Sequence, residues 1–226
     1  MKARKQPEQK ISKKVMKKTG FILLLLLMTS AAYTQGNSHQ DISKSVLSSL
    51  PEWLSSIPAG DETSYGFQNR EEFSRAVLGT PIEIFALDDD SFTHTGKATP
   101  LVSIGEWIIP VIVDQKIRAL VTVVKQNGEW RIVTFGAATL ASEFNNFENQ
   151  LTAEQFAHIK MVRVYQPLSN FLFYDDPASN PDQLILLPLR SAAMYLGSQG
   201  SPAKKTWTLS EVIRTVHESI SIQNQQ

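Results

Sequence analysis

The stretch from Gly105 to Gly136 constrains the fold most, because it is densely apolar and contains one strong turn signal. Asn127-Gly128 suits a two-residue type I′ turn, in which both central residues have positive φ. Together with a second tight turn at Asp114-Gln115, it predicts a three-stranded antiparallel meander over residues 107–135. The Asn127-Gly128 turn also fixes the strand pairing: Gln126 with Glu129, Lys125 with Trp130, Val124 with Arg131, Val123 with Ile132 and Thr122 with Val133.

Strict alternation of side chains along this hairpin predicts two different faces. The first is a core face: Ile117, Ala119, Val121, Val123, Trp130 and Ile132. The second mixes charged and apolar residues: Arg118, Leu120, Thr122, Val124, Arg131, Val133 and Phe135. A mixed face needs a partial cover, such as a helix, another strand or a ligand. The candidate ligand-binding residues are therefore on or beside it: Trp107, Arg118, Arg131 and Phe135.

Helices are predicted on both sides of the meander. Asp41 is expected to cap a helix that Pro51 breaks or restarts. The pattern from Asn69 to Glu72 resembles a capping box and predicts a helix whose buried stripe is Phe73, Ala76, Val77 and Leu78, ended by Gly79. Further helices are expected over residues 137–151, 191–196 and 208–222, the last opened by a capping box from Thr208 to Glu211.

Strands are predicted before and after the meander, at residues 82–87, 101–104, 159–166, 171–174 and 183–187. The order of these elements indicates an α+β fold, a curved antiparallel sheet packed against several helices. We expect one domain over residues 61–226, preceded by an amphipathic helical segment at residues 35–60. That segment could lie on a membrane or a partner, but amphipathic helices more often pack on their own domain.

The first residues are typical of a secretory signal peptide. Basic residues precede the apolar run Phe21–Met28, and small residues follow it. We therefore expect residues 1–34 to be a signal peptide cleaved between Ala32 and Gly36, with Met16 as a possible true start. An uncleaved membrane anchor is the alternative, although the run is shorter than the roughly 20 residues that span a bilayer.

The amino-acid composition limits the cellular locations and the classes of binding partner that we expect for this protein. The chain has no cysteine, which excludes disulfides, thiol catalysis and Cys-ligated metal, and export of this kind is typical of bacteria. Residues 1–34 hold eight Lys or Arg and one acid, so of 22 basic and 22 acidic residues 14 and 21 remain, a net charge of −7. The net negative charge of the chain after residue 34 argues against nucleic acid as a partner. We expect a periplasmic or secreted protein.

The usual catalytic patterns are missing from the sequence. It contains no Gly-x-Ser-x-Gly, no Gly-x-Gly-x-x-Gly and no phosphate-binding loop. The loop with Asp88, Asp89, Asp90 and His94 lacks the spacing of a calcium site, so we expect neither a metal nor a cofactor. Four carboxylates near strand ends could serve glycoside hydrolysis, but acids are common there: Glu106, Glu129, Asp175 and Asp176.

The sequence therefore predicts an exported, non-catalytic binding or interaction module for an unknown small ligand or protein. One alternative is a carboxylate-dependent hydrolase acting on a glycan or peptide. Another is a component of envelope assembly.

Overall fold

The computed structural model describes residues 39–87, 101–148, 150–165, 168–174, 184–198, 200 and 204–223. The chain divides into two units, Met1–Asp41 and Ile42–Gln226. Only residues 39–41 of the first are described, and they are helical, so Asp41 is not the helix cap that the sequence predicts. The predicted signal peptide lies outside the described residues, and so does the acidic loop with Asp88 and His94.

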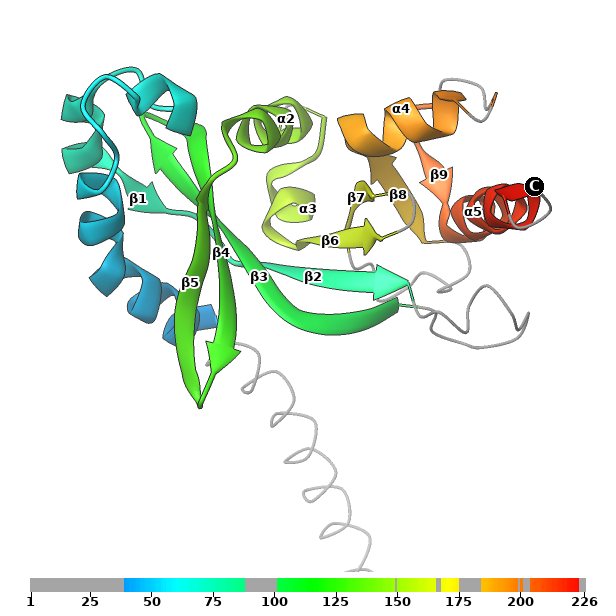
Figure 1. Ribbon diagram of the computed structural model, residues 1–226, viewed down its shortest axis with the longest axis horizontal. Coiled ribbons are helices and arrows are strands. Elements are labelled where there is room, and N and C mark those ends of the chain that lie inside the picture. The colour runs from blue at the N-terminus through cyan, green and yellow to red at the C-terminus, as the bar shows by residue number, and fades with distance from the viewer. Residues whose placement is uncertain are drawn as a thin grey trace, which may run out of the picture. The chain divides into compact units, whose positions relative to one another are not determined.

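The second unit is an α+β fold, as predicted, in which helices pack against one open sheet (Figure 1). After a helix over residues 42–55 come two 3₁₀ helices, η1 (Glu62–Tyr65) and η2 (Arg70–Arg75). The sheet strands are β1 (Val77–Leu78), β2 (Ile82–Leu87), β3 (Leu101–Val113), β4 (Lys116–Gln126), β5 (Glu129–Gly136), β6 (Ile159–Val164), β7 (Ser169–Tyr174), β8 (Ile185–Pro188) and β9 (Trp207–Thr208). The later helices are α2 (Ala138–Glu148), α3 (Ala153–Ala157), α4 (Arg190–Ser198) and α5 (Leu209–Gln223).

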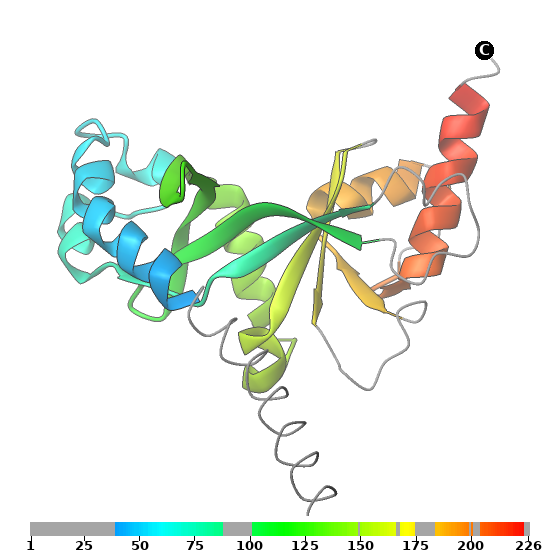
Figure 2. The same cartoon turned by 90° about the horizontal axis from the view of Figure 1, so that it is seen from below.

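The strand order is β5-β4-β3-β2-β6-β7-β8-β9, with β1 pairing with β3 beside β2. The strand pairs are antiparallel, as predicted, except that β2 and β6 are parallel, so the sheet is mixed. The chain returns to β2 only after the meander and helices α2 and α3, and such a crossover brings the next strand in parallel. Figure 2 shows the long strands β2 and β3 side by side between the N-terminal helix and the β6–β7 pair.

The predicted Asn127-Gly128 hairpin is confirmed. Asn127 has φ 53° and Gly128 has φ 86°, and the four strand pairs nearest the turn match the prediction. The fifth pair is wrong, because Thr122 faces Thr134 and Val133 is an extra residue in a β-bulge. The Asp114-Gln115 turn is also present, with φ values of 50° and 64°.

Bulges explain why the predicted hairpin faces are partly wrong. In β4, Ile117 pairs with Ile112 and Ala119 pairs with Val111, so Arg118 is an extra residue. Each bulge shifts the alternation by one residue and bends the strand. Ile117 therefore joins a core cluster on the α2 side of the sheet, whereas Phe135 packs on the opposite side with Val121 and Val123.

The helix over residues 42–55 covers one side of the meander, and α2 covers the other (Figure 1). The helix buries an apolar stripe against the sheet: Ile42, Val46, Leu50 and Leu54. It continues through Pro51, contrary to the predicted break, with the proline on its exposed side. The helix over residues 42–55 thus packs on its own domain.

The predicted helix after Asn69 is wrong. Asn69 makes no side-chain cap bond, the turn is a short 3₁₀ helix, and residues 77–78 form a strand that pairs with β3. Gly79 does not cap a helix but donates its backbone N–H to the carbonyl of Pro110 (2.8 Å). The β-branched Val77 favours this extended pairing over helix. Pro110 itself lies where β1 and β2 meet on β3, beside the bulge at Arg118.

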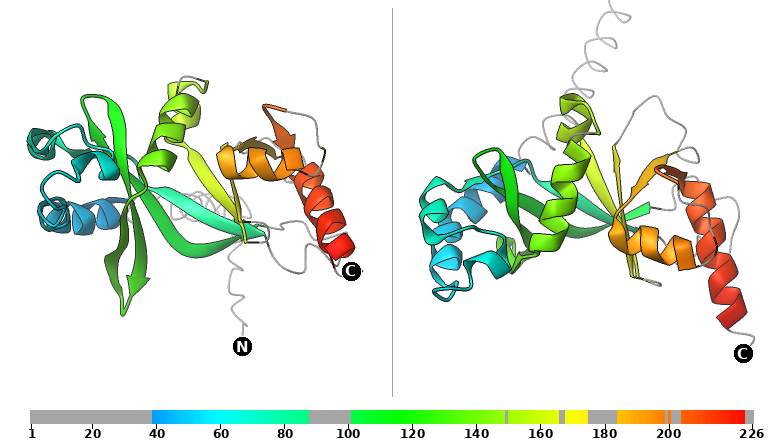
Figure 3. Two further views of the ribbon diagram at one scale, coloured as in Figure 1. Left: turned by 45° about the horizontal axis from the view of Figure 1, so that its top comes forward. Right: turned by 90° about the horizontal axis from the view of Figure 1, so that it is seen from above.

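A third cluster joins α4 and α5 to the last strands, β7 to β9 (Figure 3). The predicted capping box opens α5: Glu211 N–H donates to Thr208 Oγ1 (3.2 Å), and Thr208 N–H donates to Glu211 Oε2 (3.0 Å). Lys204 Nζ lies 2.8 Å from Glu211 Oε1. The hydrogen bond from Lys204 and the one from the Thr208 backbone lower the pKa of Glu211.

Candidate functional site

The four predicted site residues contact different neighbours, and none of them lines the three pockets described below. Trp107 packs edge-to-face against Trp130, with ring centroids 6.5 Å apart, and Lys125 lies over the Trp130 ring at 5.7 Å. Arg131 is exposed and pairs with Glu129 (3.1 Å). Phe135 packs inside an aromatic cluster with Trp53, Tyr65 and Phe67, at centroid distances of 6.2–6.4 Å.

Arg118 is better buried than Arg131, the other charged residue of the predicted site, and it pairs with Glu72. Arg118 Nη2 lies 2.6 Å from Glu72 Oε1, and the Glu72 side chain is only 2% exposed. The other carboxylate oxygen of Glu72 accepts the backbone N–H of Gln68 (2.8 Å). Glu72 thus binds the loop before η2. The backbone N–H that it accepts is that of Gln68, one residue before the Asn69 N–H that the predicted capping box would use.

The carboxylates proposed for hydrolysis are also engaged in ion pairs. Glu106 Oε2 lies 3.0 Å from Arg163 Nη1, and both side chains are about 30% exposed. Glu129 is at the exposed hairpin end, paired with Arg131. Asp175 and Asp176 lie outside the described residues. Within the part of the chain that the structure describes, no group of three or more His, Cys, Asp or Glu could hold a metal ion.

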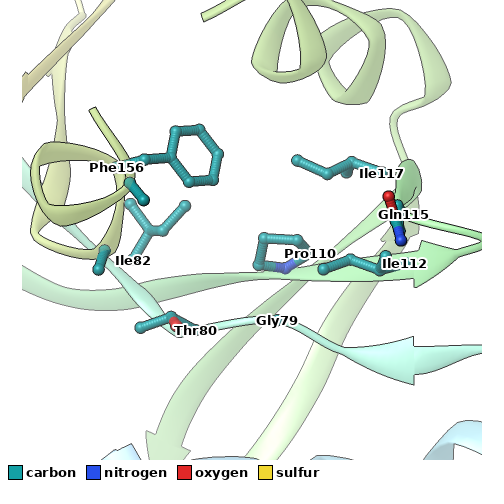
Figure 4. Close-up of a pocket in the computed structure, with 10 residues that line it drawn as sticks. Gly79, Thr80, Ile82, Pro110, Ile112, Gln115, Ile117 and Phe156 are labelled. Atoms are coloured by element: carbon teal, nitrogen blue, oxygen red, sulfur yellow. The ribbon is translucent and has the colours of Figure 1, made fainter. Parts of the chain in front are cut away.

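The geometry favours a different site, an apolar pocket of about 570 Å³ beside α3. Pro110 and Ile112 of β3 form its floor, Ile117 of β4 forms one wall, and the link between β1 and β2 closes a second side. Helix α3 closes a third side. Figure 4 shows Phe156 of α3 and Ile117 pointing toward one another across the pocket above Pro110.

Local sequence signals place each wall of this pocket. Thr152 is the N-cap of α3 and forms a capping box with Gln155, so the helix starts at Ala153. Ala153 and Ala157, one turn apart on this helix, line the pocket. The bulge at Arg118 turns Ile117 to the pocket side of β4. The Asp114-Gln115 turn then puts Gln115 at the pocket rim.

An ion pair supports the turn that carries Gln115. Arg75 of η2 lies 3.1 Å and 3.4 Å from the two carboxylate oxygens of Asp114. This hydrogen bond, with the Asp114 charge, raises the pKa of Arg75. Because both charges are paired with each other and neither side chain lines the pocket, the rim keeps Gln115 and Thr80 as its polar groups.

Two further recesses fit a ligand less well. A polar one between α2 and α4 contains Glu143, whose carboxylate accepts the backbone N–H of Arg190 (2.7 Å) and so already occupies the start of α4. A groove between the helix over residues 42–55 and η2 contains Leu50, Phe73 and Arg70, and the guanidinium of Arg70 is already paired with Glu62 (3.2 Å).

The sequence does not reveal the α3 pocket, because its residues come from three separate segments. Two of these segments carry a recognisable local signal: one holds the proline in β3 and the tight turn at Gln115, and the other begins with the capping box of α3. What joins them is the parallel pairing of β2 with β6, which brings α3 over the end of β3 and β4.

Comparison with known proteins finds no matching family, curated protein or solved structure. Fold and pocket alone therefore define the class of this protein: an α+β domain with an open mixed sheet and an apolar pocket under a short helix. Among the residues that the structure describes, no helix combines the length and apolar character needed to cross a membrane.

Proposed function

We propose that this protein is an exported, non-catalytic binding protein that holds a small apolar ligand in the α3 pocket. The observation that carries the proposal is the pocket itself. Its volume of about 570 Å³ falls within the 300–1,000 Å³ typical of small-molecule sites, and most of its lining is apolar. None of its ten lining residues, all of them within the described part of the chain, is charged or can act as a nucleophile at neutral pH except the weakly reactive Thr80 hydroxyl.

Ion pairing of two candidate carboxylates, Glu106 and Glu129, supports the proposal that the protein is not catalytic. Glu106 and Glu129 each pair with an arginine, so neither is a free general acid or base in this arrangement. The chain should therefore turn over neither glycans nor peptides. Turnover that is abolished by Glu106→Gln or Glu129→Gln would contradict the proposal and favour the hydrolase.

Nile red, a neutral apolar dye, tests the binding function. We would titrate it into the protein recovered from a bacterial expression host, and expect saturable fluorescence enhancement at one dye per chain. Fractionation and N-terminal sequencing of the same material test export, with the mature N-terminus expected between Ala32 and Gly36.

Two alanines of α3 provide the decisive variants. Ala153→Leu and Ala157→Leu place a larger side chain in the pocket from a helix whose alanines are exposed, so both variants should fold and bind the dye at least tenfold more weakly. Glu154→Leu is the matched control, since Glu154 is on the same helix but does not line the pocket. Equal dye binding by all three variants and the parent would contradict the assignment of the pocket.

A further inference from the structure

We infer that the ligand of the α3 pocket is a neutral amphiphile, with an apolar body inside the pocket and one uncharged hydrogen-bonding end at Gln115. This inference rests on the proposed binding function and goes beyond it, because it specifies the charge and the polarity pattern of the ligand. It follows from three features: the buried apolar interior, the position of Gln115, and the pairing of the nearest charges.

The interior of the pocket suits an alkyl or ring system. Ile82 and Ile117 are 3% and 5% exposed, so these walls are fixed parts of the core. Pro110 is buried on the floor between them, and its closed ring leaves no backbone N–H to bind a polar group. A ligand group lying here must therefore be apolar, because a polar group would lose its hydration without a partner.

The polar end of the ligand is assigned to Gln115. Its side chain lies at the end of the pocket away from Phe156 (Figure 4), and it is exposed to solvent at the rim. A carboxamide both donates and accepts hydrogen bonds, so it can bind a hydroxyl, an ester or an amide of the ligand.

The charged residues next to Gln115 disfavour a ligand with an ionic head group. Asp114, beside Gln115, is already paired with Arg75, and Lys116 on the other side does not line the pocket. A carboxylate or ammonium bound to the Gln115 amide would give up part of its hydration without gaining an ion-pair partner from the pocket lining. A hydroxyl or ester head loses far less hydration and can replace it with the Gln115 amide.

Three ligands with the same alkyl chain test this inference: 1-decanol, kept below its solubility limit, and decanoate and decyltrimethylammonium, each kept below its critical micelle concentration. Each would compete with Nile red for the protein. We expect 1-decanol to bind at least tenfold more tightly than either ion. Equal or tighter binding of either ion would overturn the inference.

A variant of Gln115 tests the polar end. Gln115→Gly removes the amide while keeping the turn, because glycine readily adopts the φ of 64° found there. This substitution should lower the affinity for 1-decanol about two- to tenfold, which is the loss expected for one hydrogen bond. It should leave the affinity for Nile red unchanged. Lys116→Ala is the control and should change neither. Unchanged 1-decanol affinity in Gln115→Gly would overturn the assignment of the polar end.

The outcomes separate this inference from the proposed function. Absence of saturable Nile red binding would remove both. Dye binding that Ala157→Leu weakens, combined with equal affinity for the three alkyl ligands, would leave the binding function and remove only the neutral amphiphile.

Discussion

The side chain of Asn145 in α2 makes the hydrogen bonds to β4 that a neighbouring strand would make, and removing it should lower the stability of the domain. Strand β5 pairs with β4 only as far as Leu120, opposite Gly136, so Ile117 has no partner strand on that side. Asn145 Oδ1 accepts the backbone N–H of Ile117, and Asn145 Nδ2 donates to the carbonyl of Ile117, both at 2.9 Å. The amide thus mimics one residue of a β-ladder.

The expected loss follows from these two bonds. Each is worth about 0.5–1.5 kcal/mol net, and Ile117 is too well buried for water to replace them freely, so Asn145→Ala should lower the free energy of unfolding by about 2–3 kcal/mol. In a domain of this size that corresponds to a fall in Tm of roughly 4–12 °C. Urea unfolding followed by tryptophan fluorescence measures the change, with the slope m expected to stay constant.

The neighbouring asparagine provides the control. Asn146 is exposed, and it is its backbone carbonyl that accepts a hydrogen bond, from Gln150 (3.1 Å). Asn146→Ala should therefore change the free energy of unfolding by less than about 0.5 kcal/mol. Equal effects of the two substitutions would refute the strand-mimic argument, as would an Ile117 amide that exchanges with deuterium no faster in Asn145→Ala.

Three further predictions follow from the core and from α5. Arg118→Met leaves the Glu72 carboxylate buried without its partner and should cost about 3–5 kcal/mol in urea unfolding, whereas adding Glu72→Leu should recover most of that loss; a double variant no more stable than the single one would contradict the pairing. Gly66 and Gly60 have φ values of 96° and 94°, but only at Gly66 would a Cβ meet backbone, 1.9 Å from the Arg118 carbonyl oxygen. Gly60→Ala should therefore cost about 1–2 kcal/mol, and Gly66→Ala about 4 kcal/mol or more; equal Tm values would refute this. The lowered pKa of Glu211 means that its stabilising effect is full above the ordinary value of 4.5 and is lost as the pH falls through the folded value. Thermal unfolding of the parent should thus lose more stability than Glu211→Gln between about pH 5 and pH 3, and parallel curves would contradict the shift.

The parts of the fold that follow from local chemistry could be predicted from the sequence. Asn127-Gly128 determined its turn because few residues tolerate positive φ, and the capping box at Thr208 determined the start of α5 because its two hydrogen bonds join residues three apart. The segment after Asn69 differs from the prediction for a non-local reason. Val77 and Leu78 gain more from pairing with β3 than from continuing a helix, and nothing near them in sequence shows that partner.

The bulge at Arg118 shows why the site could not be predicted along with the fold. Alternation alone places Ile117 on the same face as Ala119 and Val121, and Arg118 on a mixed outer face. The extra residue moves Ile117 across the sheet, where it becomes a wall of the α3 pocket and receives the Asn145 amide. The same bulge leaves Arg118 free to reach Glu72 under η2. One inserted residue therefore forms the pocket wall on one side of the sheet and the buried ion pair on the other, so Arg118, one of the four predicted ligand contacts, is held in an ion pair that supports the fold.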